Sequence, residues 1–256
     1  MPQVLEKSPD ILEIFLEIDH PREFSLTELA EFSGLNIATV SRILSILVKR
    51  GYLRQPEKRG KYSLGMKFLD FTGLIKGRIK LRDVAFSFVV KLSREVDESV
   101  ILSSWDGIEG IHIATVNTNH LLKIVPEEGT RFSLYSTGIG KAILANVTDD
   151  EFERYVSSNT LKGHTPKTIT DITVLKKHLR MVKRGGVAFD SEEQYQGISN
   201  VASVFKDNEG NISGAVGVLG PSVRLTRTRM EEIAPAVKRC ALEISKALGY
   251  EEEDLC

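Results

Sequence analysis

The chain has 256 residues, of which 41% are hydrophobic, and its formal net charge at pH 7 is −1. That length accommodates one large domain or two smaller ones, and the near-neutral charge excludes a protein that binds nucleic acid over its whole surface. No apolar run reaches the roughly 20 residues of a membrane span, and the N-terminus lacks the regions of a secretory signal. We therefore expect a cytoplasmic protein without a membrane partner.

The first predicted helix has Ser8 as its N-cap and Pro9 in its first turn. A proline is tolerated there because the first N–H groups of a helix have no partner within it. We expect this helix to end near Ile18, because His20-Pro21 follows.

Segment 26–45 has the spacing of a helix-turn-helix, with a small residue at Ala30, a glycine at Gly34 and a β-branched residue at Val40. Ala30 allows two helices to approach closely, Gly34 can adopt the positive φ of a tight turn, and Val40 packs the second helix on the first. The predicted caps are a capping box of Ser25 with Glu28 for the first helix, and Asn36 for the second.

Charge is divided unevenly around this motif. Residues 1–35 hold two basic and eight acidic residues, whereas residues 36–62 hold seven basic residues and one acidic one. The net charge is therefore −6 for residues 1–35 and +6 for residues 36–62, so the positive charge is concentrated on the second helix and the segment after it. This concentration is typical of a surface that binds phosphate groups.

A basic β-hairpin is predicted after the second helix, with strands 51–54 and 61–64 joined by the turn 55–60. Helix, turn, helix and hairpin together form a winged helix, which predicts binding to double-stranded operator DNA. The recognition helix spans 37–50 and ends at Gly51. The residues that we assign to DNA contact, including three wing cations for the phosphate backbone, are Asn36, Ala38, Thr39, Ser41, Arg42, Ser45, Lys58, Arg59 and Lys61.

The rest of the chain alternates strands and helices. We expect a DNA-binding domain at 1–65, a linker helix at 66–80 and a second domain at 81–256. The predicted strands of the second domain are 100–105, 111–116, 121–125, 187–189, 201–205 and 212–219, and its predicted helices include 141–146, one capped by Thr148, one from Asp171 to 185–186, and one from Thr226. The strands 201–205 and 212–219 are predicted to pair as a hairpin across Asp207-Asn-Glu-Gly210. This order indicates an α+β fold with a mostly antiparallel sheet and flanking helices.

Catalysis finds little support in the sequence. It contains no G-x-S-x-G or H-E-x-x-H motif, its five histidines are scattered, and Cys240 and Cys256 lack the spacing of metal ligands. His112 could line a pocket, but a place on the polar face of its strand is the simpler interpretation. We expect no enzyme activity, no cofactor and no metal.

Two features suggest a ligand site. Gly138-Ile-Gly140 precedes a helix, so its amide groups could bind a carboxylate, although the glycines could also serve only a tight turn. Asp190 follows a short apolar strand, where its carboxylate could meet a ligand hydroxyl or could cap a turn.

Several separated motifs resemble the IclR family of bacterial transcription regulators: YSTGIGKAILA at 135–145, RGGVAFDSEE at 184–193, Gly197, and AVGVLGP at 215–221. The resemblance covers nearly the whole chain. It implies a GAF-like effector domain, dimers through the DNA-binding domain that often pair into tetramers, and control of catabolic operons by small organic acids.

Carried over from similar proteins, the effector contacts fall at Leu121, Gly138, Ile139, Asp190, Asn200, Gly217 and Leu219, to which the amide argument adds Gly140. Asn200 stands where the pattern of the family's best-known member has a cysteine, and Gly217 and Leu219 stand where that pattern has serines. The expected pocket is more apolar and favours an acid larger than pyruvate.

We therefore interpret the chain as a ligand-responsive regulator of a catabolic operon that senses a small carboxylic acid as a homodimer or dimer of dimers. Repression is the favoured mode of action and activation is the alternative. A DNA-binding protein that oligomerises without sensing a ligand is the alternative from another class.

Overall fold

The computed structural model describes residues 2–17, 23–55, 60–74 and 76–251. The chain divides into two compact units, Met1–Ile79 and Lys80–Cys256. Among the described residues no single helix is long and apolar enough to cross a membrane; α2 and α3 pass that test only as a pair bent by 113°.

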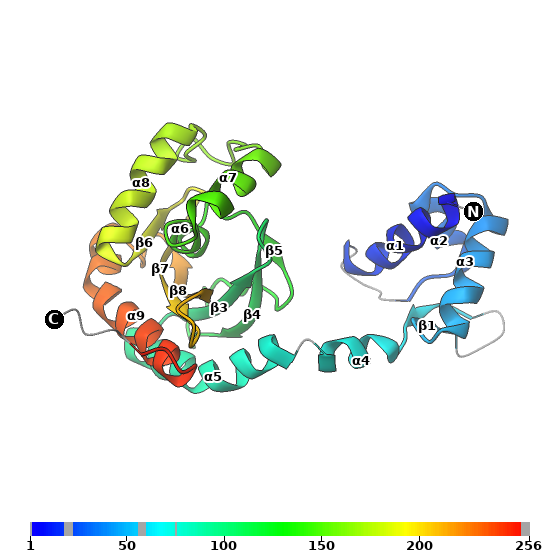
Figure 1. Ribbon diagram of the computed structural model, residues 1–256, viewed down its shortest axis with the longest axis horizontal. Coiled ribbons are helices and arrows are strands. Elements are labelled where there is room, and N and C mark those ends of the chain that lie inside the picture. The colour runs from blue at the N-terminus through cyan, green and yellow to red at the C-terminus, as the bar shows by residue number, and fades with distance from the viewer. Residues whose placement is uncertain (1, 18–22, 56–59, 75, 252–256) are drawn as a thin grey trace. The chain divides into compact units, whose positions relative to one another are not determined.

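The N-terminal unit, blue to cyan in Figure 1, is helical with one small hairpin. Its apolar core includes Ile11, Phe15 and Leu29. Leu53 pairs with Leu64 in the antiparallel hairpin. The elements are α1 (Pro2–Glu17), α2 (Leu26–Ser33), α3 (Ile37–Lys49), β1 (Leu53–Arg54), β2 (Ser63–Leu64) and α4 (Lys67–Leu74).

The predicted start of the first helix at Ser8 is wrong, because α1 already begins at Pro2 and contains Pro9 in its interior. Pro2 takes the first helical position, for which its fixed φ is suited, and Pro9 costs one hydrogen bond within the helix. The expected end near Ile18 lies outside the described residues.

The helix-turn-helix prediction is confirmed down to its caps. The Ser25 amide donates to Glu28 Oε2 at 2.7 Å, and the Glu28 amide donates to Ser25 Oγ at 3.3 Å. Gly34 has a φ of +64° between the helices. Asn36 Oδ1 accepts from the Thr39 amide at 2.8 Å. In each cap, the side chain accepts from a backbone N–H group of the first turn that has no partner within the helix.

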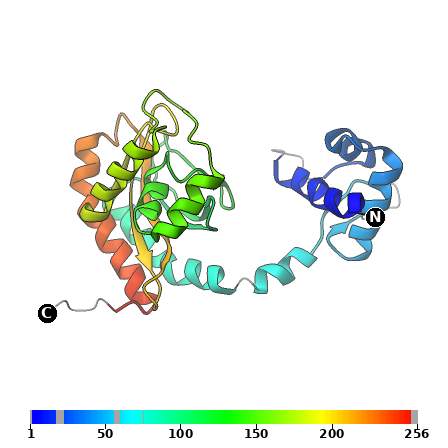
Figure 2. The ribbon, with the colours of Figure 1, turned by 45° about the horizontal axis from the view of Figure 1, so that its top comes forward.

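The C-terminal unit is built on one six-stranded antiparallel sheet with the order β5-β4-β3-β8-β7-β6 (Figures 1 and 2). Strands β7 and β8 form the predicted hairpin, with Val201 opposite Val218. The strands are β3 (Ser99–Trp105), β4 (Gly110–Val116), β5 (Arg131–Phe132), β6 (Ala188–Ser191), β7 (Ile198–Lys206) and β8 (Ile212–Pro221).

Helices cover both faces of this sheet and create two cores. On one face, α5 and α9 pack on β3, β7 and β8 through residues such as Leu92 and Val237. On the other face, α6, α7 and α8 enclose a second core around Ile143 and Tyr155. The helices are α5 (Lys76–Val96), α6 (Gly138–Leu144), α7 (Asp149–Ser158), α8 (Ile172–Gly185) and α9 (Arg227–Ala247).

Four local predictions differ from the structure. No strand forms at 121–125, because the edge of β4 pairs instead with β5, where Ile111 lies opposite Arg131. Helix α6 begins at Gly138 rather than Lys141, since Thr137 caps it there. Strand β6 is shifted to Ala188–Ser191 by its pairing with β7. The segment predicted as one linker helix contains α4 and the start of α5.

Candidate DNA-binding surface and effector cavity

Helix α3 separates its apolar and polar residues in the way that a recognition helix requires. Val40, Ile43, Leu44 and Leu47 are buried in the core. Of the residues assigned to DNA, Asn36, Ala38, Arg42 and Ser45 are exposed, and Thr39 and Ser41 are half-buried. Within the described part of the chain, no ion pair engages Arg42, so its guanidinium can reach a base or a phosphate.

The wing is partly described. Arg54 Nε donates to Ser63 Oγ at 2.9 Å across β1 and β2, which ties the two strands together. Lys61 is exposed beside them. Lys58 and Arg59, the other two predicted phosphate contacts, lie outside the described residues.

A cavity of about 240 Å³ opens on the sheet face that carries α6. Four of the predicted effector contacts line it: Ile139, Asp190, Asn200 and Leu219. The residues that the sequence did not assign are Ile101, His112, Ile124, Val125, Pro126, Thr130, Arg131, Phe132, Thr137, Gln194, Tyr195 and Ile198. The lining is therefore mostly apolar, with a few polar groups that can fix a ligand's orientation.

The predicted contact at Leu121 is not supported, because this residue is fully exposed and does not line the cavity. The expected strand at 121–125 would have carried it along the sheet, but the segment is a loop. Ile124, Val125 and Pro126 of the same loop line the cavity instead.

The three glycines at the site permit close packing rather than lining the cavity. A Cβ on Gly138 would collide with Asn200 Oδ1, and one on Gly140 would collide with the Leu134 backbone. A Cβ on Gly217 would come within 2.7 Å of Ile139 Cγ1. Gly138 and Gly140 lie in the first turn of α6 without a positive φ, so the structure indicates close packing and not the tight turn that we considered.

The predicted carboxylate site on the amides of 138–140 is also largely occupied by the protein itself. The Ile139 amide donates to Asn200 Oδ1 at 3.0 Å, and the Gly140 amide donates to Thr137 Oγ1 at 3.0 Å. Asn200 Nδ2 in turn donates to the Val218 carbonyl at 2.9 Å. Two of the three amides are thus satisfied without a ligand.

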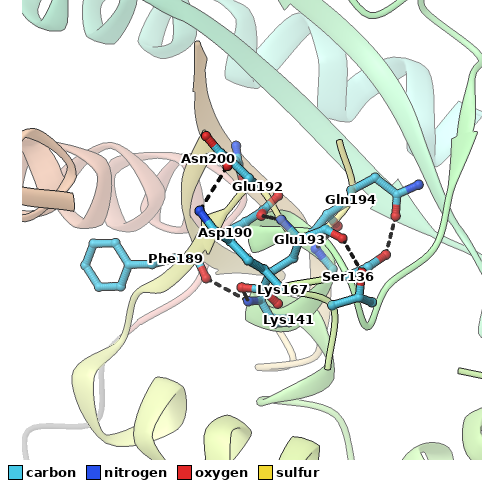
Figure 3. Close-up of polar contacts among 12 residues, drawn as sticks. Ser136, Lys141, Lys167, Phe189, Asp190, Glu192, Glu193, Gln194 and Asn200 are labelled. Atoms are coloured by element: carbon cyan, nitrogen blue, oxygen red, sulfur yellow. Dashed lines mark hydrogen bonds and ion pairs between the residues drawn. The ribbon is translucent and has the colours of Figure 1, made fainter. Parts of the chain in front are cut away.

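Asp190 caps a turn (Figure 3) and also lines the cavity. Its Oδ1 accepts from the Glu193 amide at 2.8 Å. The carboxyl is only 3% exposed, and this burial raises its pKa to about 7, against the opposing effects of the Glu193 amide and Lys141.

A buried lysine, which the sequence gave no reason to single out, lies beside Asp190. Lys141 is completely buried and donates to the Phe189 carbonyl at 2.7 Å and to Glu193 Oε1 (Figure 3). The second carboxylate oxygen of Glu193 is buried without a partner among the described residues. The cluster therefore holds two carboxyls and one cation, and the ion pair joins Lys141 to Glu193.

His112 lines the cavity, so our preference for a place on the polar face is corrected. Its Nδ1 lies 3.0 Å from Ser103 Oγ, and its ring stacks on Phe132 with centroids 4.5 Å apart. Burial lowers the pKa of His112 to about 4, so the ring is neutral at pH 7. Arg131, at the exposed side of the cavity, is paired with Asp106 and with Glu109 at 3.4 Å.

A winged helix with a polar recognition face, followed by a sheet domain with a buried ligand-sized cavity, defines a DNA-binding transcription regulator. The model of the bacterial transcriptional regulator IclR C-terminal domain matches residues 75–246, and that of the IclR helix-turn-helix domain matches residues 4–57. The chain belongs to the IclR family. This is a family of transcription regulators, so the chain is not an enzyme.

Named relatives match over nearly their full length. The chain is 28% identical over 250 residues to the transcriptional repressor AllR of Salmonella typhimurium, covering 96% of this chain and 90% of the relative. The crystal structure of the Thermotoga maritima IclR matches with a TM-score of 0.77 and 31% identity, covering 98% of this chain and 100% of that one.

A more distant structure shares the fold alone. It is an IclR homologue from Microbacterium hydrocarbonoxydans in complex with 4-hydroxybenzoate, with a TM-score of 0.82, 20% identity, and 96% and 98% of the two chains covered.

Proposed function

We propose that this regulator represses a catabolic operon and that a small organic acid in the cavity of the C-terminal unit changes its affinity for operator DNA. The observation that carries the proposal is the cavity itself, which combines an apolar lining with the buried carboxyl of Asp190. Such a pocket is typical of a small-molecule site. Repression is supported by the similarity to AllR, whose name describes a repressor.

For DNA, we propose that Arg42 contacts a guanine and Thr39 a base edge or phosphate, with the other assigned residues of α3 beside them. Lys58, Arg59 and Lys61 would hold the phosphate backbone from the wing. The exposed position of Arg42 on α3 supports this assignment, since a recognition helix reads bases through its exposed face.

For the effector, we propose contacts by Ile139, Asp190, Asn200 and Leu219 together with the apolar residues that line the cavity. The homologue that holds 4-hydroxybenzoate shows that a protein of this fold can bind an aromatic acid, which supports an acid larger than pyruvate here. The predicted domains at 1–65, 66–80 and 81–256, and a place in the bacterial cytoplasm, remain part of the proposal.

We further propose a homodimer or a dimer of dimers. A helix-turn-helix reads a two-fold operator when two copies lie about 34–36 Å apart, or a multiple of that distance. Light scattering that returns a monomer at micromolar concentration, with and without operator DNA, would contradict this.

Titration of an operator fragment by fluorescence anisotropy tests the DNA assignment. Arg42→Ala should weaken operator binding by about 1–3 kcal/mol and relax the sequence preference. Lys61→Ala is the matched comparison, because loss of a phosphate contact should weaken binding to all sequences similarly and flatten the salt dependence. An Arg42→Ala protein with wild-type operator affinity across salt concentrations would show that the recognition face is assigned wrongly.

A further inference from the structure

The cavity has a buried inner end and an exposed outer end. The inner end is formed by Ile139, Asp190 and Asn200, all at most 3% exposed. The outer end carries Val125, which is 48% exposed, and Tyr195, which is 60% exposed. The polar groups at the two ends decide which end of a ligand can enter first.

A ligand at the inner end meets no accessible positive charge among the described residues. The ammonium group of Lys141 is completely buried and is used by Glu193 and the Phe189 carbonyl, and Lys141 does not line the cavity. His112 is neutral at pH 7. Arg131 belongs to the exposed side, where its side chain is 51% exposed and is held by acidic residues of the β3–β4 turn.

Asn200 occupies one of the α6 amides that could bind an anion. Its Oδ1 accepts from the Ile139 amide, so this side-chain oxygen already occupies the position at which a ligand carboxylate oxygen would accept the same hydrogen bond. Its Nδ2 is directed to the Val218 carbonyl. Both halves of the Asn200 side chain are therefore engaged within the protein.

What the inner end offers is an acceptor. Asp190 uses Oδ1 for the Glu193 amide, and its carboxylate has further lone pairs to share. Above about pH 7, where Asp190 is ionised, the two carboxyls of the cluster outnumber its single cation, Lys141. A ligand carboxylate placed here would be buried against like charge, whereas a hydroxyl would donate a hydrogen bond.

We infer that the effector carries a hydroxyl or similar neutral donor that binds Asp190 at the inner end, and that any carboxylate on the same molecule lies at the solvent-exposed outer end. The ligand class is thus a hydroxylated acid with an apolar body, entering hydroxyl first. The inference rests on the proposed function, since it assumes that this cavity is the effector site. Asn200 and Asp190 orient the ligand, because Asn200 occupies the Ile139 amide of α6 and Asp190 accepts the hydrogen bond of the hydroxyl.

Isothermal titration calorimetry of the full-length protein at about pH 8 tests this with two matched pairs of probes. The pairs are 4-hydroxybenzoate with benzoate, and 6-hydroxyhexanoate with hexanoate. In at least one pair the hydroxylated probe should bind about 10-fold or more tightly, as expected for a hydrogen bond to a charged group. Because both members of a pair carry the carboxylate, the comparison isolates the hydroxyl.

Two variants change the polar groups at the inner end of the cavity. A loss of folding would weaken binding of all probes, whereas these variants should change the preference between the two members of a pair. Asp190→Asn can keep an oxygen on the Glu193 amide but replaces a charged acceptor by a neutral amide, so it should reduce the preference for the hydroxylated probe. Asn200→Ala should free the Ile139 amide and tighten binding of benzoate or hexanoate. Asn211→Ala, an exposed asparagine in the β7–β8 turn, is the control and should change neither preference.

The possible failures are distinguishable. If benzoate and hexanoate bind the wild-type protein as tightly as their hydroxylated partners, or if Asp190→Asn leaves the preference unchanged, the inference is overturned while effector binding stands. If none of the four probes binds at millimolar concentration, the ligand class is wrong. The proposed function itself fails only if no compound that occupies the cavity changes operator affinity.

Discussion

Replacing Asp190 by asparagine should remove a pH dependence from the free energy of unfolding. Burial raises the pKa of this carboxyl to about 7 from an ordinary value of 3.8. The folded protein therefore retains a proton that the unfolded chain releases, so the stability contributed by the protonated group is lost as pH rises from about 4 to about 7.

The magnitude follows from this shift. A rise in the pKa of Asp190 from 3.8 to about 7 corresponds to roughly 4 kcal/mol of unfolding free energy over the whole pH range in which the group titrates. Between about pH 5 and pH 8, linkage gives a loss of about 2–3 kcal/mol in the wild-type protein. Since asparagine does not titrate, Asp190→Asn should gain about that much stability relative to wild type over the same interval.

Urea unfolding followed by the fluorescence of Trp105, the single tryptophan, measures this in the C-terminal unit. Burial lowers the pKa values of His112 and His178 to about 4, so the unfolding free energy also falls as pH drops below about 6.5. This contribution is the same in the wild-type protein and the variant, so it cancels in their difference. Asp83→Asn, at an exposed site on α5, controls for loss of a carboxylate. Parallel stability curves for wild type and Asp190→Asn would refute the reasoning.

Two further predictions concern packing and charge. Gly140→Ala should lower the melting temperature, by several degrees for each 1–2 kcal/mol lost, because its Cβ would strike the Leu134 backbone, whereas Gly185→Ala meets open space and should be nearly neutral; equal melting temperatures for the two variants would contradict the packing argument. Lys141→Met should cost about 3–5 kcal/mol in urea unfolding by leaving Glu193 buried without its cation, and adding Glu193→Gln should recover part of that loss. A double variant no more stable than Lys141→Met would show that the ion pair is not the cause.

The parts of the fold that the sequence predicts correctly are those determined by local signals. The helix-turn-helix follows from Gly34 and two caps that each join residues three positions apart. The β7–β8 hairpin follows from the turn at 207–210, whose Gly210 has a φ of +81°. In both cases the hydrogen bonds that determine the local structure join residues of the same short segment, so the sequence of that segment is enough to predict it.

The site depends on contacts that no local pattern contains. Asn200 reaches the Ile139 amide across 61 positions, and Lys141 reaches Glu193 across 52. The loop before β5 also depends on a contact outside its own segment. The sequence predicts a strand at 121–125, but the edge of β4 pairs with β5, where Ile111 lies opposite Arg131. Family resemblance predicts Asp190 and Asn200 as effector contacts, but only the folded arrangement shows that Asn200 accepts from the Ile139 amide and that Asp190 is buried beside a second carboxyl.

The most direct test of the account is the operator affinity of the full-length protein with and without a compound that occupies the cavity. The operator fragment is selected in vitro, and occupancy of the cavity is established by calorimetry together with loss of binding in Asp190→Ala. We expect a change of roughly 5- to 150-fold in operator affinity for the wild-type protein, while Asp190→Ala binds the operator with near wild-type affinity and does not respond. An operator affinity that stays the same while the cavity is occupied would contradict the central claim.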